Sequence, residues 1–385
     1  MLHPDSRSSQ GERVVVAMSG GVDSSVAAAL LVQQGFEVIG LMMRLWSEPV
    51  IGGAPALNRC CTPDQMADAR RVAQHLGIPF YVLDTQAEFH ATIVQSFIDG
   101  HHAGRTPNPC INCNRQIRFT YLLEHARALG AHYLATGHYA RVRKTGKQYQ
   151  LLQGIDLQKD QSYVLHVLNQ DKLAHVLFPI GEYTKDAVRA LAREFGLPVA
   201  DKHDSQDLCF VADGDYRGFL ERHSIRPIMP GPIIDQTGSE LGRHEGLPFY
   251  TIGQRKGLRI SAEQPLYVLA KDIDNKALLD GPRDALQRIH FRVRELNWIS
   301  GERPSADQSL VVKIRYKAKA VACHIIASAA DQVEVVLDEP ATGVTPGQGA
   351  VFYEDNVCIG GGLITAETGA EKVIATPRAA VDKGA

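Results

Sequence analysis

The feature that most constrains the fold is a short polar loop between an apolar strand and an apolar helix. Residues 14–18 (VVVAM) are typical of a buried strand, and they continue directly into SGGVDSS at 19–25 and then into a segment rich in Ala, Leu and Val. Glycines let backbone N–H groups converge on phosphate oxygens, and a helix start adds unpaired donors and partial positive charge. The pattern predicts an anion site, with Asp23 as a candidate ligand for a Mg²⁺ ion that bridges pyrophosphate. Because no Lys-Ser or Lys-Thr pair follows the glycines, this is not a Walker loop.

The other N-terminal segments fit a parallel sheet around this loop. Strand-like and helical segments alternate, with strands expected at 37–43, 80–84 and 133–136 and helices at 63–76, 114–129 and 184–195. Such alternation favours βα units. Met43 ends one predicted strand and Gly137 follows another, so both would lie at the sheet edge that binds ligands. For each of the two, a plain turn or core role is the alternative.

Beyond residue 201 the sequence changes to short strand-like runs separated by Gly and Pro. These runs, at 227–232, 238–248 and 266–282, predict a small β-rich domain, and the alternating runs at 310–322 and 332–337 predict a barrel. We therefore expect an α/β protein with an N-terminal parallel-sheet domain (13–204), a small central β-rich domain (205–284) and a C-terminal β barrel (285–365). Residues 1–12 and 366–385 are expected to be tails.

The charge of the chain identifies no partner by itself. Among 385 residues, 41 Lys and Arg face 43 Asp and Glu, a net charge of -2. The cations concentrate, however, between residues 285 and 320. There Lys313, Arg315, Lys317 and Lys319 alternate with apolar residues, so a strand would place all four on one face as a row that binds phosphates. A merely solvated face is the alternative.

The seven cysteines point to thiol chemistry rather than to a disulfide framework. No apolar run approaches the roughly 18 residues of a membrane helix and the first residues are polar, so we expect a cytoplasmic protein, independent of membranes, with reduced thiols. Cys113 follows a two-proline loop at a predicted helix start, a position that lowers a thiol pKa. Cys209 ends a polar run. Two thiols that meet permit sulfur transfer through a persulfide; a buried inert thiol is the alternative, favoured for Cys323 and Cys358.

The loop SGGVDSS resembles the pyrophosphate loop of the N-type ATP pyrophosphatases, which transfer AMP to a carbonyl oxygen. Over residues 13–365 the motifs AMSGGVDSS, GRTPNPCINCNRQIRF, LATGHYAR, KDQSYVL, DSQDLCF, YTIGQRKGL and IRYKAKA follow in order, and together they are similar to the bacterial tRNA-specific 2-thiouridylase family. This resemblance implies an N-terminal ATP pyrophosphatase domain. It also implies ATP-dependent replacement of oxygen by sulfur at position 2 of wobble uridine 34 in tRNAs for Lys, Glu and Gln.

The resemblance also implies roles for individual residues. ATP would be bound by Ala17, Met18, Ser19, Gly20, Gly21, Val22, Asp23, Ser24, Met43 and Gly137. Cys209 would carry the persulfide, and Cys113 would be the partner nucleophile. Asn108, Pro109 and Cys110 would face the target base, and Lys159, Asp160, Gln161, Arg315 and Tyr316 would contact the tRNA. The partners implied are tRNA, ATP with Mg²⁺, a persulfide sulfur-donor protein (a cysteine desulfurase or a sulfur-relay protein) and a thiol reductant that opens a Cys113–Cys209 disulfide.

One departure from the family pattern affects the mechanism. Family members often carry Asp at the position of Cys110, where a carboxylate is a candidate general acid or base. Either the Cys110 thiol takes over proton transfer, or Cys110, Cys113 and Cys209 together hold a [4Fe-4S] cluster. The pair Cys60 and Cys61 is a further source of thiols, with an incidental role as the alternative.

The sequence alone leaves three alternatives open. Another pyrophosphate-loop enzyme, such as a nitrogen-transferring ligase, would need the loop but not the paired thiols. A second alternative is a non-catalytic RNA-binding protein whose cysteines hold a metal. In such a protein the nucleotide loop would take part in no reaction. Finally, Tyr163 and Phe210 are equally candidates for stacking on an extruded base and for core packing.

Overall fold

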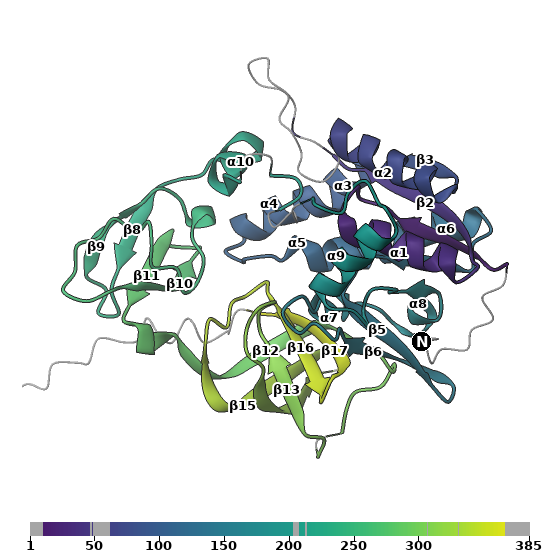
Figure 1. Cartoon of the computed structure of the whole chain (residues 1–385). Coiled ribbons are helices and arrows are strands. Elements are labelled where there is room, and N and C mark those ends of the chain that lie inside the picture. The colour runs from purple at the N-terminus through teal and green to yellow at the C-terminus, as the bar shows by residue number, and fades with distance from the viewer. Residues whose placement is uncertain are drawn as a thin grey trace, which may run out of the picture.

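The N-terminal part of the chain builds a five-stranded parallel sheet in the order β3-β2-β1-β4-β7. The computed structural model describes residues 11–46, 48, 62–202, 208–211, 214–305, 307–329 and 331–365, with the backbone alone at 327–329. Figure 1 shows this sheet with its helices, the middle domain as a separate lobe, and the C-terminal barrel beneath them in that view. The predicted α/β fold class is confirmed.

The elements of the N-terminal part follow one another as predicted strands and helices. Their bounds are β1 (Arg13–Ala17), α1 (Val22–Gln33), β2 (Glu37–Arg44), α2 (Pro63–Leu76), β3 (Phe80–Asp84), α3 (Gln86–Phe89), a π-helical turn (His90–Val94), α4 (Gln95–His102), α5 (Pro109–Asn112), a π-helix (Cys113–Leu122), α6 (Leu123–Ala128), β4 (Tyr133–Thr136), β5 (Ala140–Thr145), β6 (Gln148–Gln153), α7 (Ser162–Leu165), α8 (Gln170–Ala174), β7 (Val176–Leu177) and α9 (Lys185–Glu194). The bounds predicted for α2, β3 and β4 are confirmed.

Capping explains the ends of α2 and corrects the start of a second helix. Thr62 and Gln65 form a reciprocal capping box around Pro63, and Gly77 ends α2 in the left-handed conformation. The helix predicted from residue 114 begins at Pro109 instead. Asn108 caps it by accepting a hydrogen bond from the backbone N–H of Cys110 at 3.1 Å, and a proline suits the first helical position.

The middle domain is a four-stranded sheet in the order β10-β11-β8-β9. Its elements are α10 (Tyr216–His223), β8 (Gly231–Ile234), β9 (Glu240–His244), a 3₁₀ turn (Leu247–Phe249), β10 (Tyr267–Asp272), β11 (Ala277–Gly281) and a second 3₁₀ turn (Arg283–Leu286). One face of this sheet packs against the helices that follow β3, because Val268 and Leu278 share a core cluster with Phe97 of α4.

The C-terminal strands close into a six-stranded barrel in the order β12-β15-β14-β13-β16-β17, completed by pairing of β17 with β12. They are β12 (Gln287–Trp298), β13 (Leu310–Lys313), β14 (Val321–Ala329), β15 (Gln332–Thr342), β16 (Gly349–Glu354) and β17 (Val357–Ile364). The hairpin β5–β6 extends the same sheet, since β6 pairs with β17. The N-terminal part of the chain thus lends two strands to the barrel sheet, a sharing that the sequence does not predict.

The single strand predicted over residues 310–322 is wrong. β13 ends at Lys313, the next residues turn, and β14 begins at Val321. Alternation of cationic and apolar residues therefore arises here in a turn, and the predicted row of four cations on one strand face does not form. Among the described residues, no helix is long and apolar enough to cross a membrane.

Candidate functional site

The predicted nucleotide loop lies at the carboxyl edge of the parallel sheet, between β1 and α1. β2 and β4 flank β1 on its two sides, so Met43 near the end of β2 and Gly137 after β4 lie at the same edge as the loop. The strand order reverses direction at β1, which is where open α/β sheets bind ligands. The sequence prediction of a common edge is confirmed.

Hydrogen bonds within the loop hold its serines in place. The Ser24 hydroxyl accepts from the backbone N–H of Ser19 at 3.1 Å, and the Ser25 hydroxyl donates to the Gly21 carbonyl at 2.8 Å. The two serine oxygens of Ser19 and Ser24 lie 3.3 Å apart. These hydrogen bonds give the loop a defined shape, as suits an anion site at a helix start.

Two glycines allow other backbone segments to approach this loop. A Cβ atom on Gly20, whose φ is 69°, would lie 2.2 Å from the carbonyl oxygen of Gln65 at the start of α2. A Cβ atom on Gly137 would lie 2.7 Å from the backbone nitrogen of Ser24. The segment after β4 thus presses directly on the first turn of α1, which gives Gly137 a structural reason to be glycine.

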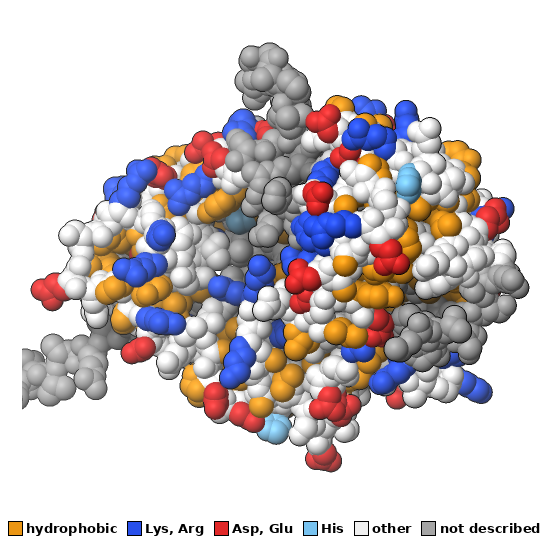
Figure 2. All heavy atoms as spheres, viewed as in Figure 1, with side chains coloured by type: hydrophobic (Ala, Val, Ile, Leu, Met, Phe, Trp, Pro, Cys, Tyr) orange, Lys and Arg blue, Asp and Glu red, His pale blue; other side chains and the backbone are white. Residues whose placement is uncertain are grey.

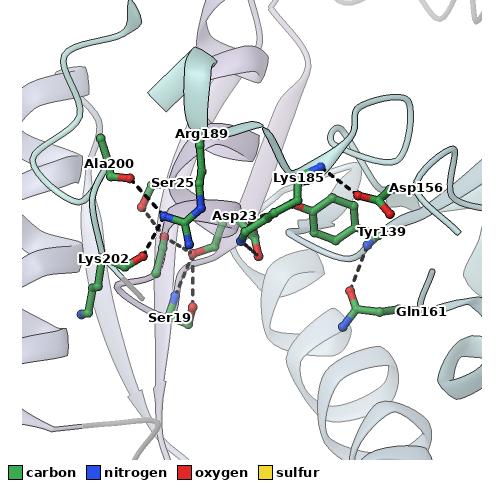
Figure 3. A network of polar contacts seen from close by, with 12 residues as sticks. Ser19, Asp23, Ser25, Tyr139, Asp156, Gln161, Lys185, Arg189, Ala200 and Lys202 are labelled. Atoms are coloured by element: carbon green, nitrogen blue, oxygen red, sulfur yellow. Dashed lines mark hydrogen bonds and ion pairs between the residues drawn. The ribbon is translucent and has the colours of Figure 1, made fainter. Parts of the chain in front are cut away.

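The first turn of α1 also carries a half-buried ion pair that sequence reasoning missed. Lys185, at the start of α9, places its Nζ 2.8 and 3.0 Å from the two carboxylate oxygens of Asp23, and the Tyr139 hydroxyl donates to Asp23 at 2.8 Å (Figure 3). A lysine in the first turn of a helix opposes the helix dipole. In the sequence, this unfavourable position of a lysine was the signal that Lys185 has an acidic partner on another element.

A second cation supports the loop from the opposite side. Lys202 donates to the Gly20 carbonyl at 2.9 Å and to the Asp68 carboxylate of α2 at 2.6 Å. Arg189 of α9 donates to the Lys202 carbonyl at 3.1 Å (Figure 3). The segment just before residue 203 is therefore tied to the nucleotide loop.

The residues of the loop fit ATP and a single Mg²⁺ ion. Mg²⁺ in nucleotide sites takes one or two protein carboxylates and completes its shell with phosphate oxygens and water. Asp23 supplies one carboxylate, partly exposed at the mouth of the loop, and Lys185 neutralises it in this structure. Asp23 would hold the ion, and the loop N–H groups and serine hydroxyls would hold the phosphates.

The two cysteines of the NPCINC segment occupy different positions in one continuous helix. Cys110, which is exposed, lies in the first turn of α5, whereas the buried Cys113 comes one turn later and begins the π-helix. The prediction that Cys113 sits at the helix start is therefore wrong, and the first-turn position belongs to Cys110. π-helical segments are frequent at functional sites.

Cys113 and the half-buried Cys209 pack on the same aromatic core, although 96 residues separate them. That cluster includes Phe89, Phe97 and Phe210, and the Phe210 ring centroid lies 5.3 Å from that of Phe97. Met43 packs against this cluster and also against the core beneath the parallel sheet. Met43 therefore connects the nucleotide edge to the cluster on which the two predicted catalytic cysteines pack.

The other thiol predictions have mixed outcomes. Cys323 and Cys358 are buried in the barrel sheet as expected, and burial raises the pKa of Cys323 to about 12. Cys60 and Cys61 lie outside the described residues. Within the described ranges no three His, Cys, Asp or Glu side chains are placed together to hold a metal ion, so Cys110, Cys113 and Cys209 are not arranged as a ligand set here.

Tyr163 and Phe210 are core residues. Both are fully buried, and the Tyr163 hydroxyl donates to the Gly349 carbonyl of the barrel at 2.9 Å. Burial of the Tyr163 phenol also raises its pKa. Of the two roles left open by the sequence, packing is therefore the one this structure shows.

The KDQ segment, predicted to contact tRNA, lies at the junction of the parallel sheet and the barrel. Asp160 is buried; its carboxylate accepts from the Ser162 hydroxyl at 2.9 Å and lies 3.4 Å from Nζ of Lys313. The Gln161 side chain accepts from the backbone N–H of Tyr139 at 2.9 Å, and Lys159 is half-buried. Gln161 thus connects this segment to Tyr139 and so to Asp23 (Figure 3). The predicted tRNA contacts of these residues stay predictions.

Arg315 and Tyr316 lie in the turn between β13 and β14. This turn faces the middle domain and the first turn of α5, which carries Cys110 and is called the Cys110 corner below. Nη2 of Arg315 donates to the Ile252 carbonyl at 3.1 Å and to the Thr345 hydroxyl at 2.8 Å. Burial, with smaller contributions from Asp160 and Cys110, raises the pKa of Tyr316 to about 12. Asn108 and Pro109 begin the helix beside this turn, so the structure brings the predicted base-facing and tRNA-facing residues to one region.

The fold is a parallel-sheet domain that carries a predicted nucleotide loop and is followed by two β domains. Residues 12–213 match the model described as the tRNA methyl transferase HUP domain, residues 217–280 that of the tRNA methyl transferase PRC-barrel domain, and residues 288–364 that of the aminomethyltransferase beta-barrel domain. The three matches follow the three structural units in order.

Three relatives give the particular family. The tRNA-specific 2-thiouridylase of Roseiflexus castenholzii is 46% identical over 368 residues, 91% of this chain and 99% of the relative. Those of Magnetococcus marinus and Chloroflexus aurantiacus are 46% and 47% identical, over 92% and 91% of this chain and 99% and 98% of theirs. The chain belongs to the tRNA-specific 2-thiouridylase family, whose members are tRNA sulfurtransferases. The nitrogen-transferring and non-catalytic alternatives are thereby set aside.

Proposed function

We propose that this chain adenylates the 2-carbonyl oxygen of wobble uridine 34 in tRNAs for Lys, Glu and Gln and then replaces that oxygen with sulfur. The observation that carries the proposal is the contact of Met43 with both core clusters. It brings the edge that would bind ATP next to the cluster that contains Cys113 and Cys209. An adenylation site and two thiols that adjoin one hydrophobic cluster can serve one substrate base.

Adenylation comes first because oxide is a very poor leaving group. In the proposed step the uridine 2-oxygen attacks the α-phosphorus of ATP, pyrophosphate leaves, and the oxygen becomes part of an AMP group. The loop 17–24, with Met43 and Gly137, holds the ATP, and Lys185 keeps Asp23 oriented toward the phosphates. A Mg²⁺ ion bound at Asp23 would neutralise charge on the leaving pyrophosphate.

Sulfur transfer then uses the two cysteines in turn. The terminal sulfur of a Cys209 persulfide attacks carbon 2, and AMP departs with the original oxygen. The Cys113 thiolate attacks the Cys209 sulfur, which forms a Cys113–Cys209 disulfide and releases 2-thiouridine. A persulfide sulfur-donor protein, either a cysteine desulfurase or a sulfur-relay protein, must first load Cys209, and a thiol reductant must reopen the disulfide.

Mass spectrometry of a tRNA fragment tests this function directly. Unmodified tRNA for Lys, Glu or Gln is incubated with the protein, ATP, Mg²⁺ and a persulfide donor, and the anticodon fragment is then isolated. Exchange of one oxygen for one sulfur at uridine 34, with one AMP and one pyrophosphate released per exchange, is the expected result. Thiolation without ATP consumption would contradict the adenylation step.

A further inference from the structure

The turn that carries Arg315 is fixed to a loop of the middle domain. Besides bonding Ile252, Arg315 approaches Gly253, whose φ of 85° shapes this loop. The Gln254 side chain accepts from the backbone N–H of Thr251 at 3.1 Å and donates to the Lys256 carbonyl at 2.9 Å. The loop therefore has a defined shape and is held from the barrel side.

The same loop is also held close to the predicted base-facing residues. Thr251 accepts a hydrogen bond from Thr106, two residues before Asn108, at 3.4 Å between hydroxyl oxygens. Thr106 in turn is bonded to the barrel through the Pro346 carbonyl at 2.8 Å and the Gln348 side chain at 2.8 Å. Three parts of the chain thus meet beside the Cys110 corner.

Four cations project from this junction. Arg255 and Lys256 from the middle-domain loop, and Lys317 and Lys319 from the barrel turn, are all exposed. Among the described residues none of the four has an ion-pair partner. In Figure 2, several Lys and Arg side chains lie along the middle of the visible face, among others spread over both lobes. Exposed cations on two segments that Arg315 joins can contact the phosphates of one nucleic-acid backbone.

We infer that Arg255, Lys256, Lys317 and Lys319 form one phosphate-binding surface for the tRNA backbone, and that Arg315 acts as the positioning residue that fixes its two halves together. This inference rests on the proposed function, because it names the surface that would hold the tRNA while uridine 34 enters the site. This surface differs from the row of cations predicted on one strand. Its cations come from two domains, and Arg315 is the strut that joins them. The surface lies beside Asn108, Pro109 and Cys110, where the target base is expected.

The test is the salt dependence of tRNA binding by wild type and three double variants. Each phosphate contact contributes about 0.7–0.9 to the slope of log affinity against log salt, so Arg255→Ala/Lys256→Ala and Lys317→Ala/Lys319→Ala should each flatten it by about 1.5. The matched control is Lys144→Ala/Lys147→Ala, two exposed cations at the tip of the β5–β6 hairpin. The control should keep the wild-type slope. Slopes of the two test variants that superimpose on wild type would overturn the surface.

Arg315 is tested in a double-mutant cycle. If Arg315 is a strut, the substitution Arg315→Ala should weaken tRNA binding in the wild-type background. It should have little further effect once Arg255 and Lys256 are alanines. An equal loss in both backgrounds would overturn the strut and make Arg315 an independent phosphate contact. If wild type itself binds no tRNA, the proposed function fails; if wild type binds but the slopes do not respond, only the surface fails.

Discussion

Around the nucleotide loop the side chains are joined by polar contacts, whereas around the two predicted catalytic cysteines they are joined by aromatic packing. Asp23 and its partner Lys185 come from different helices and meet at 2.8 Å, while Cys113 and Cys209 share a cluster of phenylalanine rings. The first region, around the nucleotide loop, would offer charged side chains to ATP, whose phosphates carry several negative charges. The second surrounds the buried Cys113 and the half-buried Cys209 with apolar rings.

This difference has a practical consequence for mutants. Changes around the loop should alter rates, because its polar side chains are the ones that would contact phosphate and Mg²⁺. In the thiol region the geometry depends on packing against Phe89, Phe97 and Phe210, together with hydrogen bonds such as that of Asn114 to the Val164 carbonyl.

The largest effect is expected at the thiols themselves. Cys113→Ser and Cys209→Ser should each abolish thiolation, because serine forms neither a persulfide nor a disulfide. Both variants should still release pyrophosphate on mixing with ATP and tRNA, since the loop is unchanged. Thiouridine formation and pyrophosphate release, measured on the same samples, separate the two half-reactions.

The control for this prediction is Cys358→Ser, which changes a buried barrel thiol outside the site. It should keep thiolation while losing some stability, because a buried hydroxyl without a good partner costs about 1–3 kcal/mol. Full thiolation by either of the first two variants would remove the persulfide mechanism.

The next effect is expected at Asp23. Asp23→Asn removes the carboxylate that Lys185 and Tyr139 orient and that would hold Mg²⁺. Loss of one oriented charge at a reacting phosphate typically lowers a rate by about 100- to 1000-fold, and we expect that reduction in pyrophosphate release. Affinity for tRNA should not change. Wild-type pyrophosphate release by Asp23→Asn would show that the carboxylate is not part of adenylation.

The same contrast explains which features the sequence could predict. The loop, its strand and the capped helix α2 depend on neighbouring residues, so spacing and capping alone predict their bounds. The ion pair between Asp23 and Lys185 joins positions 162 residues apart, and nothing near either residue names the partner. Likewise β6 pairs with β17 only because the chain returns there after 200 residues.

Two predictions from the sequence are wrong: the start of the helix at residue 114 and the single strand at 310–322. Asn108 and Pro109 form an N-cap and a first-turn proline, so the earlier start of the helix was available in the sequence. The alternation at 310–322, in contrast, is a genuine strand pattern. It fails because Arg315 turns inward to bond Ile252 and Thr345, a preference set by tertiary contacts.

A smaller effect on the loop is expected from Gly137→Ala. The added Cβ would lie 2.7 Å from the Ser24 nitrogen and 2.8 Å from the Asp23 carbonyl carbon, so the start of α1 must shift. Overpacking of this kind costs about 1–3 kcal/mol, which predicts weaker ATP binding and a lower Tm. The matched control is Gly242→Ala in β9, where the new Cβ meets no atom closer than 3.7 Å. Equal ATP affinity in both variants would contradict close packing at the loop.

The smallest effect concerns a carboxylate on the thiol side of the molecule. Asp280 of β11 is fully buried, lies opposite Val268 of the thiol-side cluster, and its two oxygens have no hydrogen-bond partner among the described residues. Burial raises the pKa of Asp280 from 3.8 to about 7. Within the part of the chain that the structure describes, no ammonium group pairs with Asp280, in contrast to Asp23 with Lys185.

The sign of the pH effect follows from this raised pKa. Between pH 3.8 and about 7 the folded protein holds a proton on Asp280 that the unfolded chain releases, so stability falls as pH rises through this window. Asp280→Asn cannot ionise and should flatten the fall, with a gain over wild type at pH 8 of about 1–3 kcal/mol, because burying a charged carboxylate costs more than burying a neutral amide. Asp284→Asn, on the exposed 3₁₀ turn nearby, is the control and should follow the wild-type profile. Thermal unfolding from pH 4 to pH 8 measures both; a parallel profile for Asp280→Asn and wild type would show that this carboxylate is solvated or paired, and that the two regions treat their charges alike.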